Sequence, residues 1–568
     1  MRAQSAYTID GKFAADVAPA ARAAAMGRPG TSARPGPHSA ASRHVAKAVR
    51  PAMMEMLEDR QLLSTYYVSP SGSDSKSGTS TSAPWKTINR VNSQKLKAGD
   101  KVLFQGGHSY SGGLYLPSSE GGSASSPVTF GTYGSGKATI NSGSKHGLDI
   151  AQTAGVSVSN LTFVGNGGGG ASGIYLHLDH SGKVKSGFFV NNVEARGYSH
   201  DGIEIKINGK GGSSLSNVKI ENTQVHDNRR NGLKATANKH NVNKNWILRD
   251  VRAFNNPGNG DNGSVTGSGI FVADLDGALI ERCVAYNNGK NGHAPVGIWT
   301  AGSNRVTVQY CESYDNKTKA ISDGGGFDFD WDTHNSVMQY NYSHDNQGPG
   351  FLLGAGSHAN SNNVVRYNVS ENDGRKNGKN GIQLWGNVTN AKIYNNTVFM
   401  ADSSSSAAFN AHNTGSNGKV AKNIEIRNNI FVVRGGSKVM NITSPVAAGN
   451  GLKFVGNAYH SYSGGFKIQW GGSGYGSLAD WRNAKGQEKL NGAATGYQGD
   501  PKLQSAGNGG TVNGNFSALG AYKLQGSSPL INKGHGQPTF LASVVKTDFF
   551  GGNSLLGGRH DIGVDEVR

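Results

Sequence analysis

The segment at residues 280–316, IERCVAYNNGKNGHAPVGIWTAGSNRVTVQYCESYDN, contains one short pattern twice. IERCVAYNN (280–288) returns, 28 residues later, as VQYCESYDN (308–316), with cysteine and the closing asparagine at matching places. Between the copies lies a glycine followed by an apolar alternation. A period of this length, built from short strands and turn residues, is typical of a solenoid whose coils are each stabilised by their neighbours.

The same pattern extends over much of the chain. Four further copies align without gaps: IENTQVHDN (220–228), LRDVRAFNN (248–256), MQYNYSHDN (338–346) and VRYNVSEND (365–373). The closing asparagines recur after 28, 32, 28 and 30 residues, at Asn228, Asn256, Asn288, Asn316 and Asn346. Glycine-led alternations accompany the copies, as in GIWTAG (297–302), GFDFDW (326–331) and GIQLWG (381–386).

The repeat favours strands over helices. Apolar residues alternate with a spacing of two, β-branched residues are abundant, and alanine is scarce inside the copies. A parallel β-helix satisfies this pattern, because equivalent positions then stack about 4.8 Å apart. We expect the closing asparagines to form hydrogen-bond ladders. We also expect an inward column of Cys283, Cys311, Asn341 and Asn368, which makes both cysteines buried neighbours rather than a functional thiol pair.

Composition sets the broad class of the chain. It has 568 residues, 84 glycines, two cysteines and a formal charge of +18. Two cysteines are too few for a disulfide framework, and no apolar run approaches the roughly 18 residues that a membrane-spanning helix needs. The charge favours a polyanionic partner, but no recognition motif for nucleic acid accompanies it, so nucleic acid is not expected. We expect a monomer.

The first 64 residues differ from the rest. They are rich in Ala, Arg, Ser and Pro without periodicity, so we expect disorder. They end in MLEDRQLLS (56–64), which resembles the LEPRxLL-type segment near the N-termini of bacterial exported and surface proteins. Asp59 stands where that segment has proline. The resemblance implies a secreted or cell-surface bacterial protein and sets this stretch apart from the fold.

Segments at both ends resemble one structural superfamily. YYVSPSGSDSKSGTSTSAPWKTINRVN (66–92) and KAGDKVLFQGGHSY (97–110) resemble the N-terminal cap of the secreted bacterial branch of the pectate-lyase-like right-handed parallel β-helix superfamily. LQGSSPLINKG (524–534) and GRHDIGVDEVR (558–568) resemble its closing strands. Because this fold carries lyases, hydrolases, epimerases and non-catalytic surface proteins, the resemblance leaves the reaction open.

The resemblance and the repeat together predict an all-β protein, a right-handed parallel β-helix with coils of roughly 28–32 residues. The expected divisions are an export segment at 1–64, a cap with first coils at 65–145, the central β-helix at 146–435, and C-terminal coils with an irregular closing segment at 436–568.

Strand alternation predicts which side chains point outward. After each glycine the next residue should point inward and the one after it outward. The first outward column is predicted to run Tyr175, Glu204, Lys234, Phe271, Trp299, Asp328, Leu352, Gln383, Phe409. The second is predicted to run His177, Lys206, Thr236, Ala273, Ala301, Asp330, Gly354, Trp385, Ala411.

An acidic stretch, SDGGGFDFDWDTHN (322–335), interrupts the basic chain. Asp328, Asp330 and Asp332 fall on every second residue, so neighbouring carboxyl groups should emerge on one face about 7 Å apart. Like charges this close raise one another's pKa. Three explanations stay open: Ca²⁺ held by Asp328 and Asp330 with Asp332 or Asp323 assisting, an acid and base pair of Asp328 and Asp330, or a solvated acidic face balanced by nearby lysines.

Aromatic side chains bracket this acidic row. Exposed rings along a sheet face suit sugar rings, whose C–H faces stack on indole or phenol. The predicted substrate-binding residues are therefore four aromatic residues of the columns, Trp299, Trp385, Phe271 and Tyr175, together with the polar residues Gln383, Glu204, Lys234 and His344. The basic charge favours an acidic polysaccharide carrying uronate or sulfate groups as the partner.

The first functional hypothesis is a polysaccharide lyase. β-Elimination needs a cation to neutralise the uronate and a base to take the α proton. The resemblance to β-helix lyases implies Ca²⁺ on the aspartate row and a lysine or arginine base. The outward positions one coil away hold no lysine, so the candidate bases are Arg375, Lys376 and Lys379 of the loop GRKNGKN (374–380), with His344 of the repeat strand as an alternative.

Two alternatives stay open. A glycoside hydrolase would use Asp328 and Asp330 as its acid and base, one of them protonated near neutral pH. A non-catalytic carbohydrate-binding or surface protein would use the repeat only as a scaffold.

Overall fold

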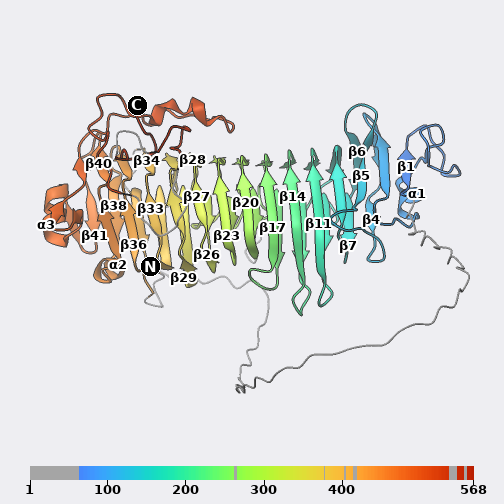
Figure 1. Ribbon diagram of the computed structural model, residues 1–568, viewed down its shortest axis with the longest axis horizontal. Coiled ribbons are helices and arrows are strands. Elements are labelled where there is room, and N and C mark those ends of the chain that lie inside the picture. The colour runs from blue at the N-terminus through green and yellow to red at the C-terminus, as the bar shows by residue number, and fades with distance from the viewer. Residues whose placement is uncertain are drawn as a thin grey trace, which may run out of the picture. The chain divides into compact units, whose positions relative to one another are not determined.

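The structure is a computed structural model that describes residues 63–568, apart from 261–264, 377, 402–404, 414–418, 537–545, 555–558 and 568. Nearly all of the predicted export segment lies outside the described residues. The described chain winds into coils whose strands pair in parallel with those of the next coil (Figure 1). The prediction of an all-β parallel β-helix is confirmed. No helix among the described residues is long and apolar enough to cross a bilayer.

The strands form three faces. The first face carries the glycine-led strands. Its members are β4 (Leu114–Leu116), β7 (Leu148–Ala151), β10 (Ile174–His177), β13 (Ile203–Ile207), β16 (Leu233–Ala237), β19 (Ile270–Val272), β22 (Val296–Thr300), β25 (Gly325–Phe329), β29 (Phe351–Ser361), β32 (Ile382–Thr389), β35 (Ala407–His412), β38 (Lys438–Ile442) and β41 (Ile468–Trp470).

The second face begins at the N-terminal end of the described chain. Its members are β1 (Thr65–Val68), β2 (Lys101–Gln105), β5 (Val128–Tyr133), β8 (Val156–Ser159), β11 (Val184–Asn191), β14 (Ser214–Glu221), β17 (Asn243–Arg249), β20 (Leu275–Glu281), β23 (Asn304–Gln309), β26 (Thr333–His334), β27 (Val337–Gln339), β30 (Val364–Arg366), β33 (Lys392–Tyr394), β36 (Ile424–Arg427) and β39 (Leu452–Val455).

The third face is a separate sheet of short strands. Its members are β3 (Ser109–Ser111), β6 (Ala138–Gly143), β9 (Leu161–Gly165), β12 (Glu194–Arg196), β15 (Gln224–His226), β18 (Arg252–Phe254), β21 (Val284–Tyr286), β24 (Glu312–Tyr314), β28 (Tyr342–His344), β31 (Val369–Glu371), β34 (Thr397–Met400), β37 (Ile430–Val433), β40 (Ala458–Ser461) and β45 (Tyr497–Gln498).

Few elements depart from the coils. β42 (Ser473–Tyr475) pairs antiparallel with β41, and β43 (Lys489–Leu490) pairs antiparallel with β44 (Ala493–Ala494). The α-helices are α1 (Ile88–Asn92), α2 (Ser444–Ala448) and α3 (Leu478–Lys485), and two 3₁₀ turns span Phe516–Ala518 and Gly520–Tyr522.

Buried ladders explain the repeat. Asn288 Nδ2 donates to Asn316 Oδ1 at 3.0 Å, and Asn316 Nδ2 donates to Asn346 Oδ1 at 2.9 Å. The residue before each closing asparagine adopts a left-handed conformation, as Asn287 and Asp315 do with φ near 51°. Asparagine and aspartate tolerate that conformation better than other residues with a Cβ. The two residues of each pair therefore have different roles in the same turn. The first adopts the left-handed conformation, and the closing asparagine forms the ladder.

The predicted inward column is also confirmed. Cys311 Sγ accepts from the backbone N–H of Cys283, and Asn341 Oδ1 accepts from that of Cys311. Asn341 Nδ2 then donates to Asn368 Oδ1 at 3.0 Å. Both cysteines are free thiols in the core. They act as buried members of a ladder.

The C-terminal segment covers part of the third face. Residues from 503 onward form one apolar cluster with outward side chains of that face. Tyr342 and Val369 belong to this cluster on the coil side, and Leu519 and Tyr522 belong to it on the covering side. Figure 1 shows the red C-terminal segment beside β28 and β34. The outward side chains of the first face are not part of this cluster.

Candidate active site

Outward side chains of the first face form the predicted column over most of its length. The parallel register places Trp299 beside Asp328, Asp328 beside Leu352, and Leu352 beside Gln383. The next member is Asn410, which pairs with Gln383. Asp328 therefore lies on the face that the sequence predicted.

The predicted end of both columns is wrong by one residue. Phe409 is fully buried and Ala411 also points into the core. His412, not Ala411, lies beside Trp385. β35 begins at Ala407 without the leading glycine from which the register was predicted, and a shift of one residue exchanges the two faces of a strand. His412 was missed for this reason.

Asp328 and Asp330 both lie close to Gly354 of the next strand. A Cβ on Gly354 would stand 2.8 Å from Oδ1 of Asp330 and 3.6 Å from Oδ1 of Asp328. Asp328 is buried, and its Oδ1 has no hydrogen-bond partner among the described residues. Asp330 accepts a hydrogen bond from the backbone N–H of Trp331 at 2.9 Å. Glycine at position 354 therefore lets both carboxyl groups pack closely against the backbone of β29.

The two carboxyl groups resist ionisation. Burial raises the pKa of Asp328 well above its ordinary value, and repulsion from Asp330 and Asp323 adds to the effect. Burial followed by repulsion from Asp323 raises the pKa of Asp330 to about 7. A carboxyl group with such a pKa is partly protonated at neutral pH and can donate a proton.

Asp323 is the third member of this carboxyl group cluster. It lies in the turn before β25 with φ of 54°. Burial raises its pKa, while the charges of Lys379 and His293 oppose that rise. Among the three aspartates, Asp323 is the one whose ionised form is favoured by nearby cations. The sequence named it only as an assisting metal ligand.

Asp332 points to different partners. It has φ of 52°, and its Oδ2 lies 3.1 Å from Nδ1 of His358 and 3.8 Å from Nε2 of His240. The backbone N–H of Ala359 donates to its Oδ1 at 3.3 Å. The left-handed turn at residue 332 breaks the strict alternation that predicted one row of three.

The donor set is a poor match for the predicted calcium site. Ca²⁺ takes six to eight oxygen ligands, whereas Asp332 is engaged by histidines. Within the described ranges, no three or more His, Cys, Asp or Glu side chains are arranged to hold a metal ion. Calcium binding stays a prediction, and no chemical step below depends on it.

Two predicted aromatic contacts are covered by protein. Phe271 and Trp299 stack with ring centroids 3.6 Å apart, and both are buried. Nε1 of Trp299 donates to Ser268 Oγ at 3.0 Å, and Val265 packs against the pair. The preceding loop therefore closes over these rings, so neither offers an open face to a sugar.

Trp385 and its neighbours form the other side of the aspartates. Trp385 is partly exposed, and its ring lies 3.6 Å from the point where Gly356 would carry a Cβ. Gln383 contacts Nε2 of His412 at 3.1 Å and accepts from Asn380 Nδ2 at 2.7 Å. Burial and the charge of Lys379 lower the pKa of His412 to about 4, so its imidazole is neutral.

Trp331 lies next to Asp330, where the alternation of the strand predicts an inward side chain unless the turn has already begun. It is partly exposed in the turn after β25, between the rings of His240 at 5.3 Å and His358 at 5.8 Å. It adds an aromatic side chain next to Asp330 that the predicted columns did not contain. Its place directly after Asp330 was the only signal in the sequence.

The two candidate lysine bases have different surroundings. Lys376 Nζ donates to the backbone carbonyl of Thr318 at 2.6 Å, a contact that holds its loop. Lys379 is close enough to Asp323 to oppose the rise of its pKa. Of the two, Lys379 alone is near the carboxyl groups.

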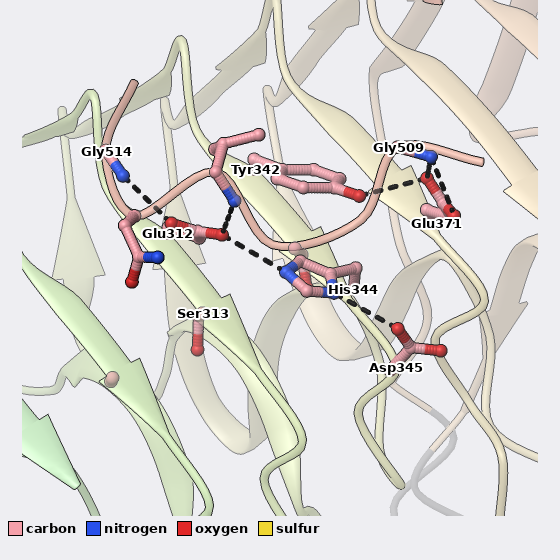
Figure 2. Close-up of polar contacts among 12 residues, drawn as sticks. Glu312, Ser313, Tyr342, His344, Asp345, Glu371, Gly509 and Gly514 are labelled. Carbon is pink, nitrogen blue, oxygen red and sulfur yellow. Dashed lines mark hydrogen bonds and ion pairs between the residues drawn. The ribbon is translucent and has the colours of Figure 1, made fainter. Parts of the chain in front are cut away.

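His344 belongs to a different site on the third face. Figure 2 shows its ring between Glu312 and Asp345, with nitrogen-to-oxygen distances of 3.3 and 3.1 Å. Backbone N–H groups of Val512 and Gly514 donate to the Glu312 carboxylate at 2.8 and 2.9 Å. The C-terminal segment therefore covers His344, and its prediction as a substrate contact does not agree with this burial.

Tyr175, Glu204 and Lys234 lie toward the N-terminal end of the same column, on β10, β13 and β16. The Tyr175 ring stacks with the rings of His146 and His177 at 4.6 and 4.8 Å. Three strand spacings separate Lys234 from Asp328, about 14 Å. These residues are not part of the aspartate site.

Sequence comparison supports the fold over the middle of the chain. Residues 253–398 match the family model described as the right handed beta helix region. This match confirms the predicted right-handed parallel β-helix. The chain is also 24% identical, over 616 aligned positions, to a lacto-N-biosidase of Bifidobacterium longum subsp. longum. That alignment covers 88% of this chain and 36% of the relative, so the chain spans well under half of that protein's length.

Solved structures with the same kind of fold include two named enzymes. The pectate lyase Pel9A is 15% identical, with a TM-score of 0.41, and the match covers 89% of this chain and 96% of that one. A GH136 lacto-N-biosidase from Eubacterium ramulus is 16% identical, with a TM-score of 0.42 and coverage of 71% and 68%. These likenesses concern the fold.

Proposed function

We propose that the protein is a carbohydrate-active enzyme that hydrolyses glycosidic bonds, with its reaction centre at Asp323, Asp328 and Asp330. One observation carries the proposal: Asp328 and Asp330 lie together against Gly354, and the buried Oδ1 of Asp328 has no hydrogen-bond partner among the described residues. Burying carboxyl groups together without a paired cation is costly for folding, so such an arrangement marks a functional site.

The carboxyl groups differ in the way that acid and base catalysis needs. Asp330, with its pKa raised to about 7, donates the proton to the leaving oxygen. Asp323, with Lys379 and His293 near it, acts as the ionised base or nucleophile. Burial and repulsion from its neighbours raise the pKa of Asp328 well above its ordinary value, so Asp328 stays neutral beside them. This assignment replaces the pair of Asp328 and Asp330 in the hydrolase hypothesis with Asp330 and Asp323.

The sequence relative supports hydrolysis. A lacto-N-biosidase, by its name, acts on a glycoside, and its alignment covers 88% of this chain. Trp385 and Trp331 are partly exposed beside the carboxyl groups and can stack on sugar rings. The resemblance of residues 56–64 to an export segment supports action outside the cell.

β-Elimination is the second candidate, because Lys379 lies near Asp323 and can take the α proton of a uronate. In that reaction the protonated Asp330 would supply the proton for the leaving oxygen. The hydrolytic assignment of these side chains uses no metal ion, whereas elimination also needs a cation to neutralise the uronate.

A glycan panel tests the proposal. The panel contains neutral oligosaccharides with a lacto-N-biose unit, uronate oligosaccharides and sulfated oligosaccharides, each assayed with and without a chelator. New reducing ends without an unsaturated product support hydrolysis, and a near-ultraviolet chromophore supports elimination. Loss of turnover when the chelator is added would support the predicted calcium site. The proposal is overturned if no glycan is cleaved, or if Asp323→Asn and Asp330→Asn both keep wild-type turnover.

A further inference from the structure

Three basic side chains gather on the first face, away from the aspartates. Lys234 lies in the outward column on β16, beside Glu204 of the preceding coil. Lys206 is two residues beyond Glu204 on the same side of β13, and Arg230 lies in the turn before β16. Electrostatic effects on Lys234 come from both Arg230 and Lys206, so the three form one group.

The protein leaves these cations without direct partners. Nε of Arg230 is buried and has no hydrogen-bond partner among the described residues. Among the described residues, the side-chain nitrogens of Lys234 and Lys206 form neither a hydrogen bond nor an ion pair within 4.0 Å. A charged nitrogen held out of water without a partner is costly, and a ligand oxygen would offset that cost.

The neighbouring carboxyl groups are directed to other partners. Glu204 Oε2 accepts from Ser172 Oγ at 2.7 Å and lies 3.8 Å from Nδ1 of His200. Asp201 Oδ1 accepts two hydrogen bonds from Asn231, at 2.8 and 2.9 Å. Oδ2 of Asp201 is buried without a hydrogen-bond partner in the described chain. Hence neither carboxyl group forms a described hydrogen bond or ion pair with Lys234, Arg230 or Lys206.

We propose that Lys234, Arg230 and Lys206 bind an anionic substituent of the glycan, a carboxylate or a sulfate. Three cations against two carboxyl groups leave a positive excess, and burial strengthens their field. The guanidinium suits the planar or tetrahedral oxygens of such groups.

This inference rests on the proposed function only for the substrate class. Lys234 and Asp328 belong to the same outward column, three strand spacings or about 14 Å apart. A glycan lying along that column would reach both sites, with its anionic substituent a few sugar units from the cleaved bond. The enzyme would then select acidic glycans that are long enough to span both sites.

A binding experiment tests the site without turnover. Calorimetry with uronate, sulfated and neutral oligosaccharides is performed on Asp330→Asn, alone and combined with Lys234→Met. We expect Lys234→Met to weaken binding of one anionic class by about tenfold or more and to reduce its salt dependence. Neutral oligosaccharides should bind equally to both proteins. Lys234→Arg, which keeps the charge, should retain the affinity.

The matched control is Lys210→Met, which removes the same charge from the exposed turn after β13. Thermal unfolding of each variant separates lost binding from lost folding. If Lys210→Met and Lys234→Met weaken anion binding equally, or if folded Lys234→Met changes nothing, the inference is overturned. If Lys234→Met abolishes anion binding while Asp323→Asn and Asp330→Asn keep turnover, the inference stands and the proposed reaction centre fails.

Discussion

Gly354 lets the Asp330 carboxyl group approach the backbone of β29: a Cβ at residue 354 would stand 2.8 Å from Oδ1 of Asp330, closer than side chains tolerate. The same point is 3.6 Å from Oδ1 of Asp328. The reaction centre thus depends on β25 and its flanking turns, which carry the aspartates, and on β29, which carries Gly354. This relation connects activity with packing and can be tested by small substitutions.

Gly354→Ala should lower kcat/KM strongly, by tenfold or more, because the new methyl group displaces the Asp330 carboxyl group. Its effect on the free energy of unfolding should be small beside this loss. Gly476→Ala is the control, since a Cβ there meets no atom within 4 Å. Kinetics on the cleaved glycan measure both, and equal kcat/KM in the two variants would contradict the role given to this point.

Asp330→Asn should remove turnover and stabilise the fold at pH 8. The folded pKa of Asp330 is raised to about 7 from an ordinary value of 3.8. The folded state therefore holds this proton more tightly, and its stability falls as pH rises from about 4 through about 7. The variant avoids this loss, so its Tm should exceed the wild-type Tm at pH 8 and approach it near pH 4.

Asp315→Asn is the control for that experiment, because Asp315 is exposed and its left-handed turn accepts asparagine equally well. Its Tm should follow the wild-type value at both pH values. A lower Tm for Asp330→Asn at pH 8 would show that the carboxyl group stabilises the fold and is not held there at a cost.

His344 should make the attachment of the C-terminal segment dependent on pH. Burial disfavours its charged form, but hydrogen bonds to Asp345 and Glu312 outweigh burial and raise its pKa to about 9. A raised histidine pKa stabilises the fold fully below the unfolded value of about 6.5, and this contribution is lost as pH rises through about 9. Urea unfolding of His344→Gln should show a deficit on the order of 1–3 kcal/mol at pH 6.

That deficit should shrink by pH 10, where the wild-type imidazole is neutral. His180→Gln, in an exposed turn, should match the wild type at both pH values. A deficit that stays constant from pH 6 to pH 10 would mean that His344 acts through packing and not through its charge.

Asn288→Ala should destabilise the coils without changing the reaction centre. The Asn288 amide donates to the carbonyl of Ala253 and to Asn316, and its Oδ1 accepts from Asn256. Removing it leaves buried polar groups without partners, at a cost of about 1–3 kcal/mol for each. Urea unfolding measures the loss. Asn89→Ala, at an exposed position of α1, should change the unfolding free energy by less than about 0.5 kcal/mol.

The sequence by itself determined the coil. The period of the closing asparagines, the inward column with Cys283 and Cys311, and the outward place of Asp328 all follow from the repeat, because stacking in register copies each position from coil to coil. Where a coil lacks its glycine, as at Ala407, this inference failed by one residue.

Only the tertiary structure decided which outward residues are free. Phe271 and Trp299 share the column of Asp328 but are buried by the loop that carries Ser268. Asp332 turns away to His358, and the C-terminal segment covers His344. Loops and distant segments that do not repeat make these contacts. Periodicity within one chain carries no information about such contacts, whereas strand pairing is local to neighbouring coils.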